Sequence, residues 1–513
     1  MRVTNNMITS NTKNNINANK ILVDQYNTQM TTQNRINKPS ENPVIAIRSL
    51  RMQTSLTHID QYLNNNIKDA DSWLEVTDTA LMNMVDILTN VRTLCIDAST
   101  GTKTADDRNT ILKQLRSLSE QIYAEGNADF SGRTVFTGYR TTEQLTFKTD
   151  EEDTTYTINQ DFDYKSLTEQ RYYYGNTEVP ADVDANTKDC DTAIGYETYQ
   201  RIRLAYGDIG TIGNRPDTTT GVVPDEILID GQPVAVKSYD NAEEWEAALA
   251  KQAADPTAQG VDPFGDNGKV VFIKETGELV FKNDYANTLK ENKSTIQVAY
   301  DKTGFTAGEP RPEYYYNCAM KTPDMKEAVE YTKENQEINF EISSGIMLPA
   351  NTQASDVLGT DIGRDMSEMI DIVNQAISAH DKVDEIKKMM SMSQYADDDS
   401  QKKLQTYLDA ANKEATYADD NLQKTYKQYI SNFDGYLEKV NIAHTNVGSL
   451  QQRVALTKTR VENQQETVEE LKTNNDKRDI SDIIIDYYAA YNAYTSSLTA
   501  ASKVGSQTLL NYL

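Results

Sequence analysis

Side chains that could carry out chemistry are scarce in this sequence. Its three histidines, His58, His380 and His444, all lie in segments whose residue pattern predicts helices. The spacings HExxH, GxxxxGK[ST], GxSxG and GxGxxG, which build zinc, phosphate, nucleophile and dinucleotide sites, do not occur in the sequence. We therefore predict a protein that is not an enzyme, with no catalytic residue, no cofactor and no metal site.

Two other clusters have simpler explanations than a ligand site. The aspartates Asp397 to Asp399 lack the alternating ligands, central glycine and terminal glutamate of an EF-hand, so we interpret them as a solvated turn between helices. The tyrosines at 172–174 and 314–316 are interpreted as strand or packing residues. Contact with carbohydrate is the alternative for these tyrosines.

Cysteine content and charge narrow the class of protein further. Cys95, Cys190 and Cys318 form neither an even set nor a CxxC pair, which predicts free thiols. The net charge of -27 is concentrated in residues 141–349, and this excess of acid disfavours binding to nucleic acid or anionic membranes. Without an apolar signal region or a run of 18 apolar residues, neither a cleaved signal peptide nor membrane insertion is expected.

The positions of the prolines indicate which segments can be helical. All twelve prolines lie between Pro39 and Pro349, and none occurs in residues 44–179. Because a proline inside a helix costs about 3 kcal/mol, proline-free stretches permit long helices. The sequence therefore predicts two helical ends that pack together while a middle of a different kind loops out.

Three stretches repeat apolar or aromatic residues at spacings of three and four, which predicts helical seams of the coiled-coil type. The first comprises Leu56, Ile59, Leu63, Ile67, Ala70, Leu74, Thr77, Leu81, Met84, Leu88, Val91 and Cys95. The second comprises Val447, Leu450, Val454, Thr457, Val461, Gln464, Val468 and Leu471, and the third Ile484, Tyr487, Tyr491, Tyr494, Leu498 and Ala501. Two consecutive spacings of four around Leu63 resemble a coiled-coil stutter. An antiparallel bundle within one subunit would also explain these seams.

The middle of the chain carries strand signals. A Glu-Thr-Gly turn between two apolar runs predicts a hairpin at 268–281. Further strands are predicted at 226–229, 234–236 and 295–300, and helices at 106–124 and 242–254. An inserted α+β module at about 216–312 follows from these elements.

The predicted fold class is mostly α, with a long coiled-coil-like helical bundle formed by both chain ends and an inserted central α+β region. The predicted parts are an assembly-ordered amino-terminal segment (1–43), an amino-terminal helical arm (44–140), a surface-exposed central region (141–349), a carboxyl-terminal helical arm (350–479) and an assembly-ordered carboxyl-terminal helix (480–513). Residues 1–36 hold too few apolar side chains to keep a helix in isolation, so partner subunits are expected to supply contacts.

A first motif, RINKPSENP at 35–43, resembles the turn between the first two helices of bacterial flagellins and their hook-associated relatives. The family usually has Asp-Asp-Pro where this chain has Glu-Asn-Pro. The positions that carry the resemblance are Arg35, Pro39, Ser40 and Pro43. We expect Ser40 to cap the following helix and Pro43 to open it.

A second motif, FSGRTVFTGYRT at 130–141, is similar to a Gly-Arg-aromatic-Phe-Gly-Tyr segment of the hook-filament junction proteins within the flagellin family. The matching positions are Gly132, Arg133, Phe136, Gly138 and Tyr139. Filament flagellins usually differ here, so the motif favours a junction protein. Filament flagellin is the alternative, and a surface adhesin or hydrolase carried by the central region is another.

The resemblance implies a structural protein whose terminal arms form concentric helical layers of a tubular homo-oligomer while the middle projects outward. It also implies export through the flagellar type III apparatus and a place outside the cell, at the hook-filament junction of the flagellum. The implied partners are the other hook-associated junction protein, flagellin and an export chaperone. Expected subunit contacts are Val3, Met7, Ile484, Tyr487, Tyr491, Tyr494, Leu498 and Leu510.

Overall fold

The chain forms two compact units in a computed structural model that describes residues 5–99, 105–183, 187–190, 192–213, 225–255, 261–265 and 268–506. The first, here the terminal unit, contains Met1–Asp71, Phe340–Leu348 and Gln452–Leu513. The second, here the central unit, contains Ser72–Asn339 and Pro349–Gln451. Sequence-distant ends therefore share one unit, as the distribution of prolines predicted.

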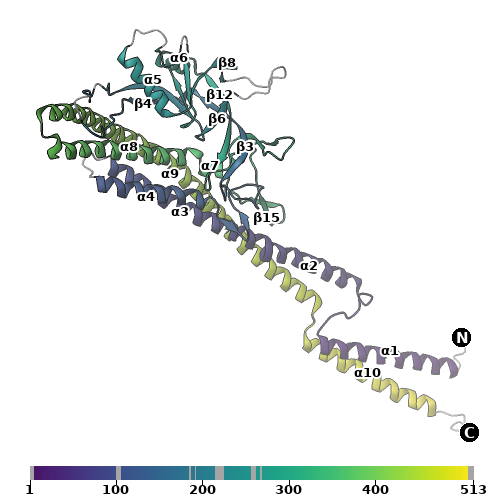
Figure 1. The fold of residues 1–513 in the computed structure, drawn as a ribbon. Helices are drawn as coiled ribbons and strands as arrows, with labels where there is room; N and C mark the ends of the chain where they lie inside the picture. Colours follow the sequence, from purple (N-terminus) through teal and green to yellow (C-terminus); the bar gives the residue numbers. More distant parts are fainter. Residues whose placement is uncertain are drawn as a thin grey trace, which may run out of the picture. The chain divides into compact units, whose positions relative to one another are not determined.

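The terminal unit is built from antiparallel helices. Helix α1 (Asn5–Thr32) runs beside α10 (Ile480–Ser506), and α2 (Pro43–Gln61) runs beside the end of α9 (Asp398–Asp476) (Figure 1). The side-chain amide of Asn19 donates to the Ser497 hydroxyl at 2.7 Å, and that of Gln465 donates to Asp60 at 2.7 Å. Most of a small hairpin, β15 (Asn339–Ser343) with β16 (Ile346–Pro349), belongs to the same unit.

The first predicted seam is buried along its length. Every member is buried except Leu63, which is half-buried. At Leu63 the helix widens into a π-helical turn, Tyr62–Ile67, before α3 (Lys68–Ala98) continues. A π-turn inserts an extra residue into the helical repeat. The two consecutive spacings of four therefore mark this turn.

The second predicted seam is only partly buried. Helix α9 buries a residue at every seventh position, at Phe433, Val440, Val447, Val454 and Val461. Beyond these positions the predicted members Gln464 and Leu471 are exposed, so the seam prediction was wrong there. This stretch of α9 still contacts α2 through Gln465 and Asp60, but these two seam members remain exposed.

The other long helices of the central unit are α4 (Ala105–Glu125) and α8 (Thr360–Met390), with the short α7 (Ala354–Val357) before α8. Helix α4 packs against α8, and its bounds agree with the helix predicted at 106–124. Long straight-chain side chains favour helix here. Tyr123 at the end of α4 donates a hydrogen bond to the carbonyl of Gly359, just before α8, at 3.0 Å.

The central unit also contains two larger sheets, the first mixed and the second antiparallel (Figure 1). One has the order β4-β5-β11-β10-β9, and the other β14-β13-β3-β12-β7-β8 with β6 beside β12. Their bounds are β3 Glu151–Asp163, β4 Thr168–Tyr174, β5 Gly195–Arg203, β6 Ile209–Ile212, β7 Glu226–Ile229, β8 Gln232–Ala235, β9 Lys237–Tyr239, β10 Val270–Ile273, β11 Glu278–Phe281, β12 Thr295–Phe305, β13 Asn317–Lys321 and β14 Val329–Tyr331. Helices α5 (Ala242–Ala254) and α6 (Asn283–Asn292) belong to the same region.

The strands and the helix predicted within 216–312 are confirmed as β7, β8, α5, the β10–β11 hairpin and β12, while α6 was not predicted. These strands do not form a sheet of their own. Strand β12 pairs with β3 from Thr295 opposite Asp163 onward, and β11 pairs with β5. The described part of 216–312 therefore shares both sheets with residues 151–203.

Candidate assembly surface

The first motif forms a joint where two linkers of the terminal unit are hydrogen-bonded together. Arg35 N donates to Asp476 O at 2.7 Å, and Arg478 N donates to Gln33 O at 3.0 Å. The side-chain amide of Gln29 donates to Arg35 O at 2.9 Å. Because the linker after α1 pairs with the linker before α10, the two terminal helices leave this joint as one pair.

The cap of α2 differs from the prediction. The side chain of Asn42, not Ser40, accepts from the backbone N–H groups of Val44 at 3.2 Å and Ile45 at 3.3 Å. Pro43 opens the helix, as predicted. Glu41 also takes part, because its carboxylate accepts from Asn37 N at 2.8 Å. Asn42 is adjacent to the first helical residue and therefore reaches the free N–H groups, which Ser40 does not.

The third predicted seam forms one stripe along α10, and only part of this stripe is covered. Tyr487 and Tyr494 are half-buried, on the side where Ile483 and Ala490 are buried beside α1. The other predicted contacts on α10, Ile484, Tyr491 and Leu498, are 37%, 45% and 43% exposed. Met7 on α1 is also exposed, and Val3 and Leu510 lie outside the described residues.

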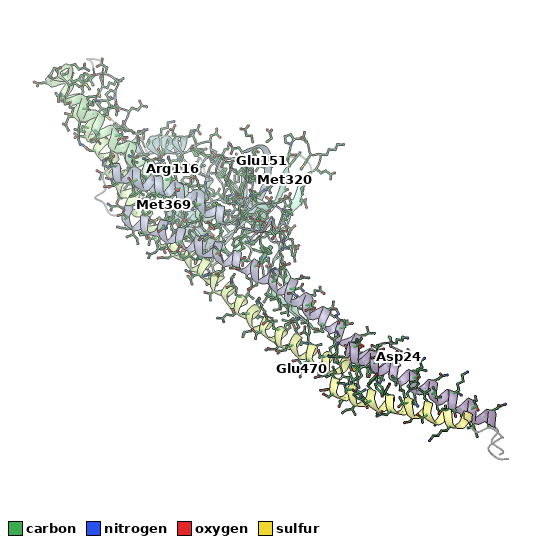
Figure 2. All side chains as sticks on the ribbon, turned by 90° about the horizontal axis from the view of Figure 1, so that it is seen from below. Asp24, Arg116, Glu151, Met320, Met369 and Glu470 are labelled. Atoms are coloured by element: carbon green, nitrogen blue, oxygen red, sulfur yellow. The ribbon has the colours of Figure 1, made fainter. Side chains whose placement is uncertain are left out.

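Exposed apolar side chains recur along both terminal helices, and we call this set the outer apolar face. Its members are Met7, Ile8, Ile21, Leu22, Ile480, Ile484, Ile485, Tyr488, Tyr491 and Leu498. Figure 2 shows side chains projecting outward along the whole helix pair, with Asp24 labelled on α1. Single exposed apolar residues are ordinary, but a series at helical spacing on paired helices makes this face a candidate interaction surface.

The second motif begins with a tight hairpin in the central unit. Strands β1 (Asp129–Phe130) and β2 (Arg133–Thr134) are joined by Ser131 and Gly132, whose φ values are 54° and 77°. The Arg133 guanidinium lies 5.4 Å from the centre of the Trp73 ring, a cation–π geometry. The motif thus fixes the end of the amino-terminal arm on α3.

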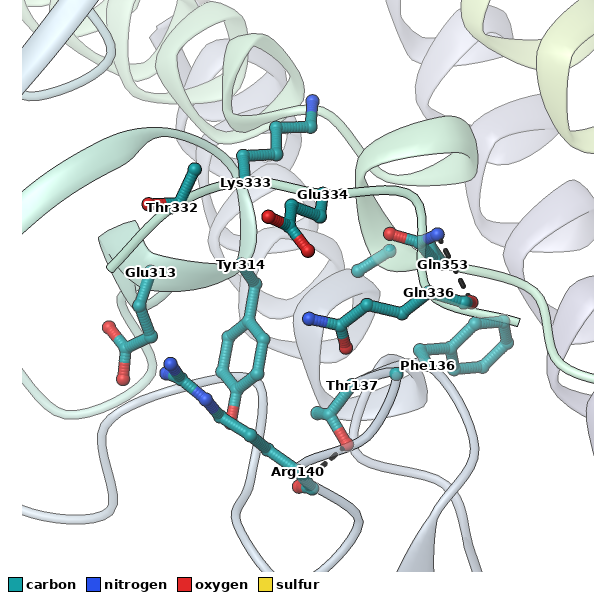
Figure 3. A pocket seen from close by; sticks show the side chains of 12 residues that line it. Phe136, Thr137, Arg140, Glu313, Tyr314, Thr332, Lys333, Glu334, Gln336 and Gln353 are labelled. Atoms are coloured by element: carbon teal, nitrogen blue, oxygen red, sulfur yellow. Dashed lines mark hydrogen bonds between the residues drawn. The ribbon is translucent and has the colours of Figure 1, made fainter. Parts of the chain in front are cut away.

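The rest of the motif holds an extended segment after β14. Gln336 Oε1 accepts from Tyr139 N at 2.7 Å, and a Cβ at Gly138 would lie 2.2 Å from the same oxygen. Phe136 is buried, and its carbonyl accepts from Ala354 N at 2.9 Å. The cavity between these groups, drawn in Figure 3, measures about 20 Å³, which is room for about one water. The motif therefore has a structural role.

Two of the histidines considered for chemistry form contacts with aspartates within the fold. His380 and His444 contact Asp419 and Asp78 at 3.0 Å on helices. Within the described ranges, no group of three histidine, cysteine or acidic side chains could hold a metal ion. Among the same residues, no helix is both long and apolar enough to cross a membrane.

The aspartate run and the tyrosine clusters also make contacts within the fold. Asp397 accepts from Ser400 N at 2.8 Å at the start of α9, which makes the aspartate run a helix-opening turn. The ring of Tyr172 packs edge-on against Trp245 at 5.7 Å, and Tyr315 is buried. The prediction that these tyrosines are packing residues is confirmed for Tyr172 and Tyr315.

A buried ionic network, which sequence reasoning missed, ties the first sheet to the helices of the central unit. Arg201 on β5 forms ion pairs with Glu278 on β11 and with Glu368 on α8, the latter at 2.8 Å. Arg203, also on β5, contacts Glu368 at 2.6 Å and pairs with the fully buried Asp365. The two arginines alternate with Ile202, which faces the sheet core.

The two arginines favour the ionised form of Glu368. Burial by itself would raise the pKa of Glu368, but the charges of Arg201 and Arg203 outweigh burial and lower this pKa to about 2. Asp365 also accepts from the Asn432 amide at 3.0 Å and the Tyr436 hydroxyl at 2.8 Å on α9. Side chains from four elements, β5, β11, α8 and α9, therefore meet in this network.

Comparison with known families gives a match for the amino-terminal arm: residues 3–141 match the bacterial flagellin N-terminal helical region. Over 118 residues the chain is 26% identical to flagellar hook-associated protein 3 of Escherichia coli (strain K12), covering 23% of this chain and 37% of the relative. Over 122 residues it is 25% identical to a flagellin of Clostridium tyrobutyricum, covering 24% and 32%. The matches span about a third of each relative.

Among solved structures, a flagellar hook-associated protein from Vibrio parahaemolyticus aligns with 85% of this chain and 100% of its own, at 10% identity and a TM-score of 0.36. A score this low does not establish a common overall fold. The relationship to flagellar proteins therefore depends on the amino-terminal arm, which has a flagellin-type helical region.

Proposed function

We propose that this chain is a structural protein of the bacterial flagellum that polymerises through its terminal helices and links the hook to the filament. One observation supports this most: the flagellin-type region at 3–141 includes α1, which pairs with α10 and shares with it the outer apolar face. A surface of this kind requires a partner.

In this proposal, the outer apolar face packs against neighbouring copies in a tube. Fully burying one isoleucine or leucine side chain contributes about 1.5–3 kcal/mol. The outer apolar face has seven isoleucine or leucine positions, and these, even partly buried, can offset the entropy lost when a subunit is immobilised. Packing of the coiled-coil type would follow from the spacing of these residues, and the central unit would project from the tube.

The junction function is the specific part of the proposal. The similarity to hook-associated protein 3 and the FSGRTVFTGYRT motif favour contacts with a second hook-associated protein on one side and with flagellin on the other. An export chaperone and passage through the flagellar type III apparatus complete the proposal, with a final place outside the cell.

Filament flagellin is the alternative function. The flagellin of Clostridium tyrobutyricum matches with nearly the same identity over nearly the same length. The two functions differ in copy number and position, because a filament protein would occur along the whole filament.

The outer apolar face can be tested with charge substitutions. Ile484→Asp places a carboxylate on this face, and the control Ala493→Asp places one on an exposed position nine residues on. Nine residues are two and a half helical turns, so the two positions lie on opposite sides of α10. We expect Ile484→Asp to abolish filament attachment and Ala493→Asp to retain it, with both proteins still exported. Attachment by Ile484→Asp at the wild-type level would refute assembly through this face.

A further inference from the structure

The central unit contains a cavity that the proposed junction function does not use. It measures about 480 Å³ and lies between the end of β4, α5, α8 and α9. Small-molecule sites typically have volumes of about 300–1,000 Å³. The cavity is therefore large enough for an organic ligand, unlike the small one beside Gly138.

One side of the cavity is aromatic. Tyr173 and Tyr174 from β4 and Tyr417 from α9 line it. The Tyr173 and Tyr417 ring centres are 6.0 Å apart, and both rings contact Tyr196, at 5.6 and 5.9 Å. The rings thus support one another and form a rigid wall, against which an apolar ring face could pack.

Another part of the cavity lining carries uncharged polar groups. Asn374, Gln375 and Ser378 line the cavity from α8, and none of their side chains hydrogen-bonds to another residue in the part of the chain that the structure describes. An amide both donates and accepts, and a hydroxyl does the same. Nearby, Lys382 pairs with Glu414 at 2.6 Å, so this ammonium is already neutralised.

The carboxylates that line the cavity determine which ligand charge can bind there. Glu243, Glu246 and Glu275 line it in addition to the paired Glu414. Burial, followed by the charges of Glu243, Glu414 and Glu275, raises the pKa of Glu246 to about 7. The cavity is therefore negative, and an anionic ligand would be repelled. Within the described residues, these carboxylates do not converge closely enough to hold a metal ion.

We propose that this cavity binds a neutral saccharide, with one sugar face against the tyrosine wall and the hydroxyls on the α8 amides and the carboxylates. Sugar hydroxyls donate and accept, so they match both the amides and the acidic groups. A simple amine only donates and would leave the amide N–H groups without partners. This binding function is separate from the junction function and does not depend on it.

Calorimetric titration of the full chain tests the inference, with N,N′-diacetylchitobiose and maltotriose as neutral probes, 3′-sialyllactose as the acidic probe and 1,5-diaminopentane as the amine. We expect at least one neutral saccharide to bind, and the acidic one to bind at least tenfold more weakly. Failure of both neutral probes to bind, or tighter binding of the amine or the acidic sugar, would overturn the proposal.

Two variants locate the binding. Tyr417→Ala removes part of the aromatic wall and is expected to weaken binding at least tenfold. Gln375→Ala changes an exposed side chain on α8, which leaves the fold intact, and is expected to weaken binding several-fold. Tyr139→Ala, at an exposed tyrosine outside the cavity, is the control and should bind as wild type. Wild-type affinity in both cavity variants would overturn the assignment to this cavity, whatever becomes of the junction function.

Discussion

The ionic network of the central unit gives a quantitative prediction for Arg203→Met. This change leaves Asp365 buried without its arginine and removes one of the two guanidinium partners of Glu368. Removing one partner of a buried ion pair typically costs about 3–5 kcal/mol, because the remaining charge is uncompensated. We therefore expect Arg203→Met to destabilise the central unit by about that amount.

The matched control is Lys424→Met, which breaks the exposed pair with Asp420 four residues earlier on α9. Exposed pairs at this helical spacing contribute about 0.3–0.5 kcal/mol. The double variant Arg203→Met/Asp365→Asn also removes the carboxylate charge that the single variant leaves unpaired. The amide oxygen that replaces it at position 365 can still accept hydrogen bonds from Asn432 and Tyr436. Its stability loss is expected to be smaller than the sum of the two single losses.

Urea unfolding followed by tryptophan fluorescence measures these losses. Trp73 lies on α3 and Trp245 on α5 beside the first sheet, and both are buried. Single-tryptophan backgrounds, made with Trp73→Phe or Trp245→Phe, therefore report the helical part and the sheet part separately. If Arg203→Met changed the free energy of unfolding no more than Lys424→Met does, the network would not hold the sheet to the helices.

Three further predictions concern the caps, the second motif and pH. Asn42→Ala should destabilise α2 by about 1 kcal/mol and Asn42→Asp should not, as measured by thermal unfolding; equal losses would contradict the cap assignment. Gly138→Ala should lower the free energy of unfolding by about 1–2 kcal/mol, because φ at Gly138 is +63°, whereas Tyr139→Ala should leave this backbone unstrained. If urea unfolding showed the larger loss for Tyr139→Ala, the role of Gly138 would be contradicted. Because the pKa of Glu368 is lowered in the folded protein, its ionised carboxylate stabilises the fold at pH values above about 4.5, the ordinary glutamate pKa, and this stability is lost as the pH falls toward about 2. If Glu368→Gln left the acid unfolding of the sheet part unchanged, this prediction would be contradicted.

Local patterns in the sequence were sufficient for much of the fold. The spacing of Leu74 through Cys95 identified the buried side of α3, and the Glu-Thr-Gly turn identified the β10–β11 hairpin. Both depend on neighbours within a few residues, where helical and strand periods leave a direct signal. The bounds of β7 and α5 also agree with the prediction.

Long-range pairing could not be predicted in the same way. Strand β12 pairs with β3, about 140 residues earlier in the chain, and no local pattern records that choice. For the same reason, 216–312 looked like a separate module in the sequence. Deleting this segment would remove one of the two partner strands of β3 and one of the two of β5, so we expect the deletion to disturb both sheets.

The candidate surface was partly predictable. The tyrosine spacing on α10 identified an unusual helix, but spacing alone did not distinguish the half-buried Tyr487 from the exposed Tyr491. That distinction requires the position of α1. Likewise, the arginines of the ionic network occur in an ordinary-looking strand, and only the position of α8 reveals their function.

Immunogold electron microscopy of intact flagella, with antibody against residues 225–255, tests the central claim most directly. These residues belong to the central unit, which we expect to project from the assembled tube. We predict gold confined to the boundary between hook and filament. Gold along the whole filament would identify a flagellin, and gold only on the cell body would contradict a flagellar function altogether.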